Sequence, residues 1–279
     1  MKIIADCGAT KSEWVTIHSD GSTSRFITKG VNASTMSAST IMDIISEAGE
    51  KISVAEQSAA EINLYMAGIP SEEIKKTICN SLQHYFPIAS LEIHSDLLGA
   101  ARAVCGHRPG IAAIIGTGSN SCMYDGIEIT KRVYSCGFIL GDEGGAATLG
   151  KLFIADFLKG LIPAEIASEF SSRYPSDYAT IVANVYKSEG SPSGYLGSFT
   201  PFILEHYDNP YIKELVDGNF RSLIRRAIKQ YDTDKYAVGV VGGFGFALKD
   251  ILSRIAEEEG VKISRFIKSP IDGLVEYHR

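Results

Sequence analysis

The stretch KIIADCGATKSEW, residues 2–14, shows the pattern from which the fold is predicted. Its first five residues are typical of a short buried strand, and a second strand follows after a turn of small residues. The amides of such a turn can bind an anion, with Gly8 allowing close approach and Thr10 and Lys11 adding donors. Asp6, at the end of the strand, can hold Mg²⁺ or its water ligands. Taken alone, the stretch is better explained as a plain β-hairpin.

The same order of elements begins again at IAAIIGTGSN, residues 111–120. In each copy, a strand, a turn of small residues, a second strand, an Asp-Gly turn and a third strand follow one another. The second turn contains Gly116, Thr117 and Gly118, and so combines glycines with a hydroxyl as the first turn does. The copies share almost no residues outside the turns, so the repeat is one of pattern. Two facing half-sites around a polyphosphate explain this duplication, whereas two unrelated hairpins do not.

Strands and helices alternate through most of the remaining chain. Hydrophobic spacing and capping residues predict helices at about 34–51, 71–84, 96–104 and 242–259, with mostly helix from 141 to 231. Strands are expected at 2–6, 13–19, 22–30, 61–68, 91–95, 111–116, 121–124, 127–135, 236–241 and 261–268. This alternation predicts an α/β fold, with mixed or parallel sheets and helices on both faces.

Three further positions combine a glycine or an acid with the start or end of an element. Gly242 and Gly243 end a strand where a helix begins, which suits a phosphorylated ligand or, equally, tight strand–helix packing. Asp142 lies between glycines, where its carboxylate can bind paired sugar hydroxyls, cap the following helix, or do both. Asp96 follows a strand and can accept a substrate proton, although an N-cap for the helix at Leu97 is the simpler interpretation.

Composition and spacing exclude several classes of function. The chain has 279 residues and a net charge of -6, which argues against a nucleic-acid partner because phosphate neutralisation needs a basic surface. No apolar run approaches the length of a transmembrane helix, so no membrane partner is expected. The five cysteines are widely spaced without a CxxC pair, which fits reduced thiols in the cytoplasm better than disulfides or a zinc site. Neither a Walker P-loop nor a GxGxxG dinucleotide loop occurs.

The turn motifs, taken together and in order, resemble those of a known family. The motifs are Asp6-x-Gly8-x-Thr10, Gly116-Thr117-Gly118-Ser119-Asn120 and Gly141-Asp142-Glu143-Gly144. They are similar to those of the N-acetylglucosamine kinase-like members of the BadF/BadG/BcrA/BcrD-type ATPase family. That family belongs to the superfamily of sugar kinases, actin and heat-shock ATPases. The resemblance spans nearly the whole chain, and its most specific part is the combination of GTGSN with GDEG.

The resemblance implies a two-lobed actin-like ATPase fold of the ribonuclease H-like class. It would contain duplicated βββαβαβα units around a central nucleotide cleft. The N-terminal lobe is expected to span residues 1–107, with the C-terminal segment 270–279 packing back on it. The C-terminal lobe is expected to span residues 108–269, with a helical insertion at about 145–231. ATP and Mg²⁺ are the expected cofactors, a sugar is the expected substrate, and a homodimer is the expected assembly.

The resemblance also implies roles for individual residues. The phosphates of ATP are expected to contact Gly8, Thr10, Lys11, Gly116, Thr117 and Gly118, with Mg²⁺ near Asp6. The adenosine-side motif matches Gly242 and Gly243, and the family's general base falls at Asp96. The positions that bind sugar hydroxyls fall at Asn32, Asn120 and Asp142. By its sequence context alone, Asn32 is either a turn residue or an amide positioned for a ligand.

The expected activity is ATP-dependent phosphorylation of an amino sugar, at the 6-hydroxyl of N-acetylglucosamine. Animal members of the family carry an aromatic–Gly–His run before the GDEG motif, whereas this chain has Cys136-Gly137-Phe138-Ile139-Leu140. Glucosamine, N-acetylmuramic acid and glucose are therefore alternative substrates. Another alternative is an ATPase that activates a 2-hydroxyacyl-CoA dehydratase through an iron–sulfur cluster, for which Cys105 and Cys136 would be the candidate ligands. A sugar sensor without catalysis is a third alternative.

Overall fold

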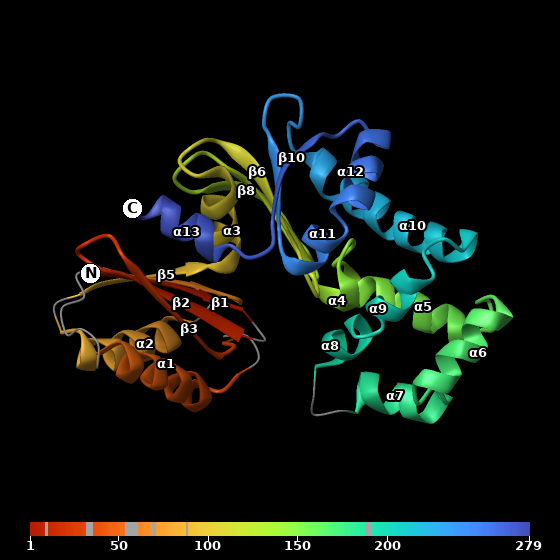
Figure 1. Cartoon of the computed structure of the whole chain (residues 1–279), viewed down its shortest axis with the longest axis horizontal. Helices are drawn as coiled ribbons and strands as arrows, with labels where there is room; N and C mark the ends of the chain where they lie inside the picture. The colour runs from red at the N-terminus through yellow and green to blue at the C-terminus, as the bar shows by residue number, and fades with distance from the viewer. Residues whose placement is uncertain (9–10, 32–35, 54–60, 69–70, 88, 188–190) are drawn as a thin grey trace. The chain divides into compact units, whose positions relative to one another are not determined.

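The computed structural model describes residues 1–8, 11–31, 36–53, 61–68, 71–87, 89–187 and 191–279. These residues form two compact units, each built around one five-stranded sheet (Figure 1). Unit 1 consists of Met1–Arg108, Gly126–Glu128 and Ser269–Arg279. Unit 2 consists of Pro109–Asp125 and Ile129–Lys268.

The sheet of unit 1 has the strand order β3-β2-β1-β4-β5. Its strands are β1 (Lys2–Cys7), β2 (Lys11–Ile17), β3 (Thr23–Lys29), β4 (Glu61–Met66) and β5 (Ser90–Ser95). The first three strands pair antiparallel, whereas β1, β4 and β5 pair parallel. β1 is therefore central, and its residues Ile3, Ile4 and Ala5 are all buried, as expected for a strand that is covered on both faces.

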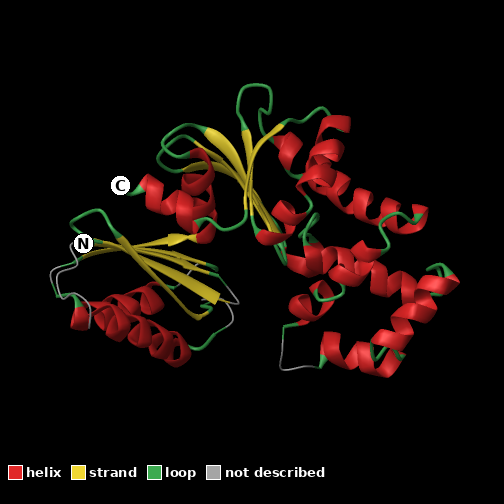
Figure 2. Cartoon of the chain, in the orientation of Figure 1, coloured by secondary structure: helices red, strands yellow, loops and turns green. Residues whose placement is uncertain are grey.

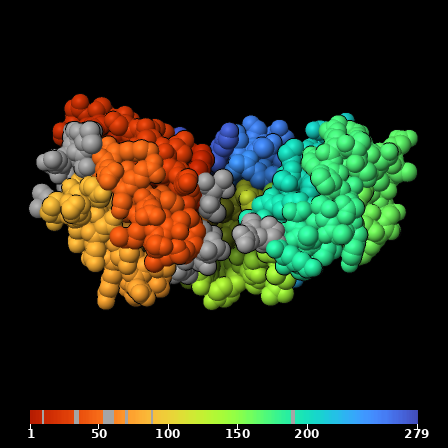
Figure 3. Space-filling view, turned by 90° about the horizontal axis from the view of Figure 1, so that it is seen from below, coloured from red at the N-terminus to blue at the C-terminus, as the bar shows by residue number. Residues whose placement is uncertain are grey.

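Helices cover both faces of this sheet (Figure 2). They are α1 (Ala38–Ser53) and α2 (Glu72–Tyr85) on one face, and α3 (Asp96–Cys105) and α13 (Ile271–Tyr277) on the other. α1 buries Ile41, Ile44 and Ile45, which lie on the face predicted from their spacing. Figure 3 shows α1 and α2, in orange, covering the lower side of unit 1, so the sheet behind them is shielded from water.

The sheet of unit 2 has the strand order β10-β9-β6-β7-β8. Its strands are β6 (Gly110–Ile115), β7 (Ser119–Tyr124), β8 (Ile129–Val133), β9 (Val238–Val241) and β10 (Ile263–Ile267). β6, β7 and β8 pair antiparallel, whereas β6, β9 and β10 pair parallel. The order and the strand directions repeat those of unit 1. The predicted α/β fold with a duplicated strand pattern is therefore confirmed.

The helices of unit 2 pack around a core rich in phenylalanine. They are α4 (Gly137–Leu140), α5 (Ala146–Leu158), α6 (Ala164–Arg173), α7 (Tyr178–Tyr186), α8 (Pro192–Gly197), α9 (Thr200–Glu205), α10 (Pro210–Arg226), α11 (Gly243–Ala247) and α12 (Lys249–Glu258). Phe153, Phe170 and Phe202 lie edge to face, with ring centroids 5.1 to 5.9 Å apart. This geometry adds aromatic attraction to the burial of large apolar side chains. None of the helices in the described part of the chain has the length and apolar character that a membrane crossing requires.

Some predicted elements differ from the structure in their bounds. β8 spans Ile129–Val133, shorter at both ends than the predicted 127–135, and Cys136 (φ 60°) and Gly137 (φ 68°) after it adopt left-handed conformations. The predicted helix 242–259 is divided into α11 and α12 at Leu248. Two of the five residues of α11 are glycines, which have low helix propensity, so this first segment stays short.

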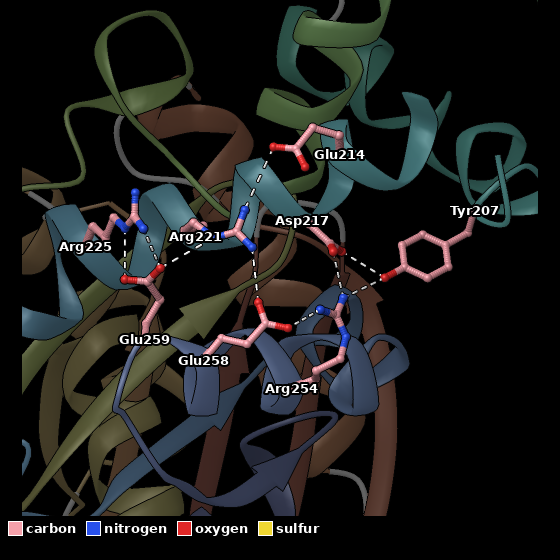
Figure 4. A network of polar contacts seen from close by, with 8 residues as sticks. All are labelled: Tyr207, Glu214, Asp217, Arg221, Arg225, Arg254, Glu258 and Glu259. Atoms are coloured by element: carbon pink, nitrogen blue, oxygen red, sulfur yellow. Dashed lines mark hydrogen bonds and ion pairs between the residues drawn. The ribbon is translucent and has the colours of Figure 1, made fainter. Parts of the chain in front are cut away.

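Ion pairs and hydrogen bonds join α10 to α12 in unit 2, and Figure 4 shows them as the α10–α12 network. Arg254 of α12 contacts the Asp217 carboxylate of α10 at 2.7 Å, and the Tyr207 hydroxyl donates to the same carboxylate at 2.8 Å. Arg225 and Glu259 form a second pair at 2.7 Å. Exposed pairs contribute little individually, but Asp217 is buried, so its partners are needed to compensate its charge. The network therefore fixes α10 against α12.

Candidate functional site

The first predicted turn joins β1 to β2 in unit 1. The Gly8 N–H donates to Lys11 O at 3.1 Å, and the Val31 N–H donates to Gly8 O at 3.0 Å. A Cβ on Gly8 would lie 3.2 Å from Lys11 O, so the turn is closed tightly around this glycine. Thr10, predicted to bind phosphate, and Asn32, predicted to bind the sugar, lie outside the described residues.

Lys11 forms an ion pair with Glu13, a residue that was not predicted from the sequence. The Ser269 hydroxyl donates to the same carboxylate at 2.7 Å. Burial opposes ionisation of Glu13, but hydrogen bonds from Lys11 and Ser269 outweigh it and hold the pKa of Glu13 below its usual value. Glu13 lies directly opposite Asp6 in the pairing of β1 with β2, and this cross-strand position is the only sequence signal that could have identified it.

Two half-buried carboxylates in unit 1, Asp6 and Asp96, have raised pKa values. Burial, together with the charges of Glu13 and Asp96, raises the pKa of Asp6 to about 7. Burial raises the pKa of Asp96 to about 6. The charge of Asp96 thus acts on Asp6, so the two predicted acids share one electrostatic environment in unit 1.

Asp96 is not the N-cap of α3. Ser95 occupies that position, and its hydroxyl accepts the Leu98 N–H at 3.2 Å. Asp96 is the first residue of the helix, and one of its carboxylate oxygens accepts the Leu97 N–H at 2.8 Å. The simpler interpretation, in which Asp96 caps a helix beginning at Leu97, is therefore wrong. The capping role belongs to Ser95 because its backbone is still extended there (φ -72°, ψ 151°).

The surroundings of Asp6 fit a magnesium ion that also binds phosphates. Within the described ranges, no three His, Cys, Asp or Glu side chains group closely enough to form a metal site made by protein alone. Mg²⁺ usually takes only one or two carboxylates, together with water and substrate phosphates. Burial first, and then the charges of Glu13 and Asp96, disfavour the ionised form of Asp6, and a divalent cation beside it would favour that form.

The second predicted turn, after β6 in unit 2, rests on the start of α5. The Gly116 N–H donates to Gly118 O at 2.9 Å. The Ala146 N–H donates to Gly116 O at 3.0 Å, and the Ala147 N–H donates to Thr117 O at 2.8 Å. The first two N–H groups of α5 thus hold the turn in place. Thr117 itself is exposed.

Asp142 contacts the same turn from the loop that precedes α5. One of its oxygens accepts the Ser119 N–H at 3.3 Å. A Cβ on Gly118 would lie 2.6 Å from the other oxygen, so the glycine makes room for the carboxylate. Burial raises the pKa of Asp142. The capping interpretation is wrong here as well, because α5 begins at Ala146 with Gly145 in the N-cap position.

Loop 141–145 is held by Asn219 of α10, a residue that was not predicted from the sequence. The Gly144 N–H donates to Asn219 Oδ1 at 2.9 Å, and Asn219 Nδ2 donates to Gly145 O at 3.2 Å. In the sequence, Asn219 could be noticed only as an amide next to Phe220 among the apolar positions of an amphipathic helix. A buried amide in that position indicates that polar partners exist elsewhere in the fold.

Asn120 lies on β7 beside a hollow of 240 Å³ within unit 2. Its Oδ1 accepts the Ser121 N–H at 2.9 Å. Cys136 and Glu143 line the same hollow, whereas Asp142 is not among the described residues that line it. Asn120 thus borders space that a small polar group of a ligand can enter.

The two glycines after β9 have different surroundings. Gly242 has a φ of 126°, and a Cβ there would lie 2.5 Å from Ile115 O, so close packing on β6 already requires a glycine. Gly243 is exposed, and no described atom lies within 4 Å of where its Cβ would be. The packing interpretation therefore accounts for Gly242, and only Gly243 has open space for a ligand.

The chain is similar to proteins of known structure, whereas no protein-family model and no curated protein matches it. A candidate N-acetylglucosamine kinase from Porphyromonas gingivalis is 33% identical, with a TM-score of 0.90 over 100% of this chain and 98% of that chain. A candidate N-acetylglucosamine kinase from Chromobacterium violaceum is 18% identical, with a TM-score of 0.78 over 100% and 98%. A ROK family glucokinase from Streptomyces griseus, in complex with glucose and AMPPNP, is 15% identical, with a TM-score of 0.51 over 99% and 97%. The last two share the fold.

Proposed function

Because the chain belongs to the N-acetylglucosamine kinase-like family of sugar kinases, which have the actin-like ATPase fold, we propose that it phosphorylates an amino sugar with ATP. The 6-hydroxyl of N-acetylglucosamine is the proposed acceptor, since two similar proteins are described by that sugar. One observation carries the proposal: each sheet ends its central strand in a glycine turn with a partly buried carboxylate beside it, Asp6 in unit 1 and Asp142 in unit 2.

ATP is the proposed phosphoryl donor. The turn after β1, with Gly8, Thr10 and Lys11, and the turn Gly116–Gly118 supply the amides, hydroxyls and positive charge that bind phosphates. Lys11 would exchange its ion pair with Glu13 for a phosphate oxygen. Gly242 and Gly243 are the proposed adenosine-side residues, with the ligand approaching at Gly243. The complex of the Streptomyces griseus glucokinase with AMPPNP, an ATP analogue, supports this choice of donor.

Asp96 is the proposed general base. As the sugar hydroxyl oxygen bonds to the γ-phosphorus, the bond from that phosphorus to the β,γ-bridging oxygen breaks, and ADP leaves. Asp96 accepts the proton that the hydroxyl loses. A pKa of about 6 keeps Asp96 ionised at neutral pH, and it also makes the carboxylate more basic than an exposed aspartate.

Asp6 is proposed to hold Mg²⁺, either directly or through the water ligands of the ion. The bound ion would neutralise negative charge on the β- and γ-phosphates. The pairing of β1 with β2 on one side and with β4 on the other fixes the backbone of Asp6 in the centre of the sheet.

Asn32, Asn120 and Asp142 are proposed to bind the sugar hydroxyls. The Asp142 carboxylate is an acceptor for two hydroxyls, and hydrogen bonds to a charged acceptor are stronger than neutral ones. Its attachment to Ser119 N–H fixes one oxygen and supports a defined direction for the other.

The proposal is tested by measuring ADP release with N-acetylglucosamine, glucosamine, N-acetylmuramic acid and glucose, each with and without Mg²⁺. The highest kcat/KM with N-acetylglucosamine, dependent on Mg²⁺, is the expected result. A higher kcat/KM with another sugar of the panel would support the kinase activity and identify that sugar as the substrate. If no sugar accelerates ADP release, the proposal of sugar kinase activity is wrong.

A further inference from the structure

Asn219 is buried where loop 141–145 meets α10, with only 3% of its surface exposed. Its neighbour Phe220 is fully buried, so the amide has to find polar partners inside the protein. It finds them on the loop, accepting the Gly144 N–H at 2.9 Å and donating to Gly145 O at 3.2 Å. The oxygen and the nitrogen of the Asn219 amide thus each bond one of two consecutive residues of loop 141–145.

The loop has a backbone conformation that depends on such contacts. Asp142 has a φ of 54° and Gly144 a φ of 82°, both in the left-handed region. A Cβ on Gly144 would lie 2.6 Å from Leu223 Cδ2, which also belongs to α10. A residue with a side chain persists in this region only where the surrounding structure determines it. Through Asn219 and Leu223, α10 helps to hold the loop in this conformation.

We infer that Asn219 is a positioning residue for sugar binding, an inference that rests on the proposed function. By fixing Gly144 and Gly145, it holds the loop so that the Asp142 carboxylate stays against the Ser119 N–H. Without the amide, the loop loses two hydrogen bonds and Asp142 loses its fixed direction. The glycine turn keeps its own bonds from the first amides of α5, so ATP binding should change less than sugar binding.

Asp217 offers a matched control on the same helix. It is 5% exposed, nearly as buried as Asn219, and it lies two residues earlier. Its carboxylate bonds Arg254 of α12 and Tyr207, which lies just before α10, and Figure 4 shows both contacts. Asp217→Asn therefore weakens the packing of α10 without removing a bond to loop 141–145.

The experiment compares Asn219→Leu, which keeps a similar volume, with Asp217→Asn. The measurements are the KM for N-acetylglucosamine, the KM for ATP, the thermal midpoint and amide hydrogen exchange of residues 141–147. We expect Asn219→Leu to raise the sugar KM about tenfold or more, as expected when a binding group is displaced. The ATP KM should change less, and exchange in the loop should accelerate. Asp217→Asn should lower the thermal midpoint while leaving the sugar KM and the loop exchange near wild type.

A sugar KM for Asn219→Leu within twofold of wild type, or an equal rise in Asp217→Asn, would overturn the positioning role. If the wild-type protein phosphorylates no sugar of the panel, the proposed function fails and the sugar-binding part of this inference fails with it. Hydrogen exchange then still tests whether Asn219 holds loop 141–145. Exchange of the loop in Asn219→Leu that is as slow as in wild type would show that the amide does not hold it.

Discussion

The turn after β1 and the turn after β6 occupy matching places in two copies of one sheet, yet their surroundings differ. In unit 2, the amides of α5 and the carboxylate of Asp142 bond the turn, and Asn219 holds the loop beside it. In unit 1, Glu13 lies opposite Asp6 in the strand pair, and the charges of Glu13 and Asp96 add to burial in raising the pKa of Asp6.

This difference separates two kinds of contribution to one proposed reaction. Unit 2 supplies groups whose positions are fixed by satisfied hydrogen bonds. Unit 1 supplies two carboxylates whose pKa values are raised to about 7 and about 6, and a raised pKa makes Asp96 a better proton acceptor. Variants of unit 1 should therefore act mainly on turnover and charge, whereas variants of unit 2 should act mainly on substrate affinity.

The largest effect is expected for Asp96→Asn in unit 1. The amide keeps the shape of the side chain but cannot accept the proton, so kcat should fall by about a hundredfold or more. A coupled ADP assay at saturating sugar and ATP measures this change. Sugar affinity, measured by calorimetry, should stay near the wild-type value, and a kcat close to wild type would remove Asp96 from the proposed chemistry.

A smaller effect, of another kind, is expected for Asp142→Ala in unit 2. The sugar loses a charged acceptor, so its dissociation constant should rise about 10- to 100-fold, because hydrogen bonds to charged groups contribute about 1.5 to 3 kcal/mol. Calorimetry with N-acetylglucosamine measures the change. Unchanged affinity would leave Asp142 with a purely structural role at the second turn.

Asp6→Asn should alter stability in a pH-dependent way. The pKa of Asp6 is raised from 3.8 to about 7 in the folded protein, so the stability that proton uptake provides is present below pH 4 and is lost as the pH rises toward 7. The amide does not ionise, so without Mg²⁺ the variant should gain about 1 to 3 kcal/mol over wild type at pH 8 and much less at pH 4. Thermal melts at both pH values with EDTA measure this. A difference that does not depend on pH would contradict the raised pKa of Asp6.

The smallest effect is expected within the second turn. Gly118→Ala places a Cβ 2.6 Å from an Asp142 oxygen and should move that carboxylate, which raises the sugar KM several-fold and costs about 1 to 3 kcal/mol of stability. At Gly116, no described atom lies within 4 Å of the added Cβ, so Gly116→Ala should destabilise less. Melting curves and sugar KM values for the two variants test this, and equal losses in both would argue against contact between Gly118 and Asp142.

Much of the fold was predictable because its signals are local. The strands KIIAD and IAAIIG are apolar on both faces, and each is followed by a turn whose residues allow only a few conformations. The early end of β8 was not predictable in this way. The residues up to 135 continue the strand-like pattern, and the left-handed conformation of Cys136 that follows has no signal in the sequence either.

The candidate site was predictable only where its residues follow a strand or a glycine. Asp6, Asp96 and Asp142 could be singled out on that ground. Asn219 could not, because its partner Gly144 lies 75 residues away in the sequence. The capping prediction for Asp96 was wrong by one position, because Ser95 is the N-cap, and that for Asp142 by three, because Gly145 is the N-cap. The choice of cap depends on where the backbone leaves its extended conformation.

The last helix of the chain belongs to the first unit. α13 packs on α3, and a Cβ on Gly273 would lie only 2.3 Å from Ala103 O, so the two helices are in close contact. During synthesis, the ribosome therefore has to make all of unit 2 before unit 1 can be completed. Until α13 emerges from the exit tunnel, α3 packs on its sheet but lacks the cover that α13 provides, so unit 1 is completed last.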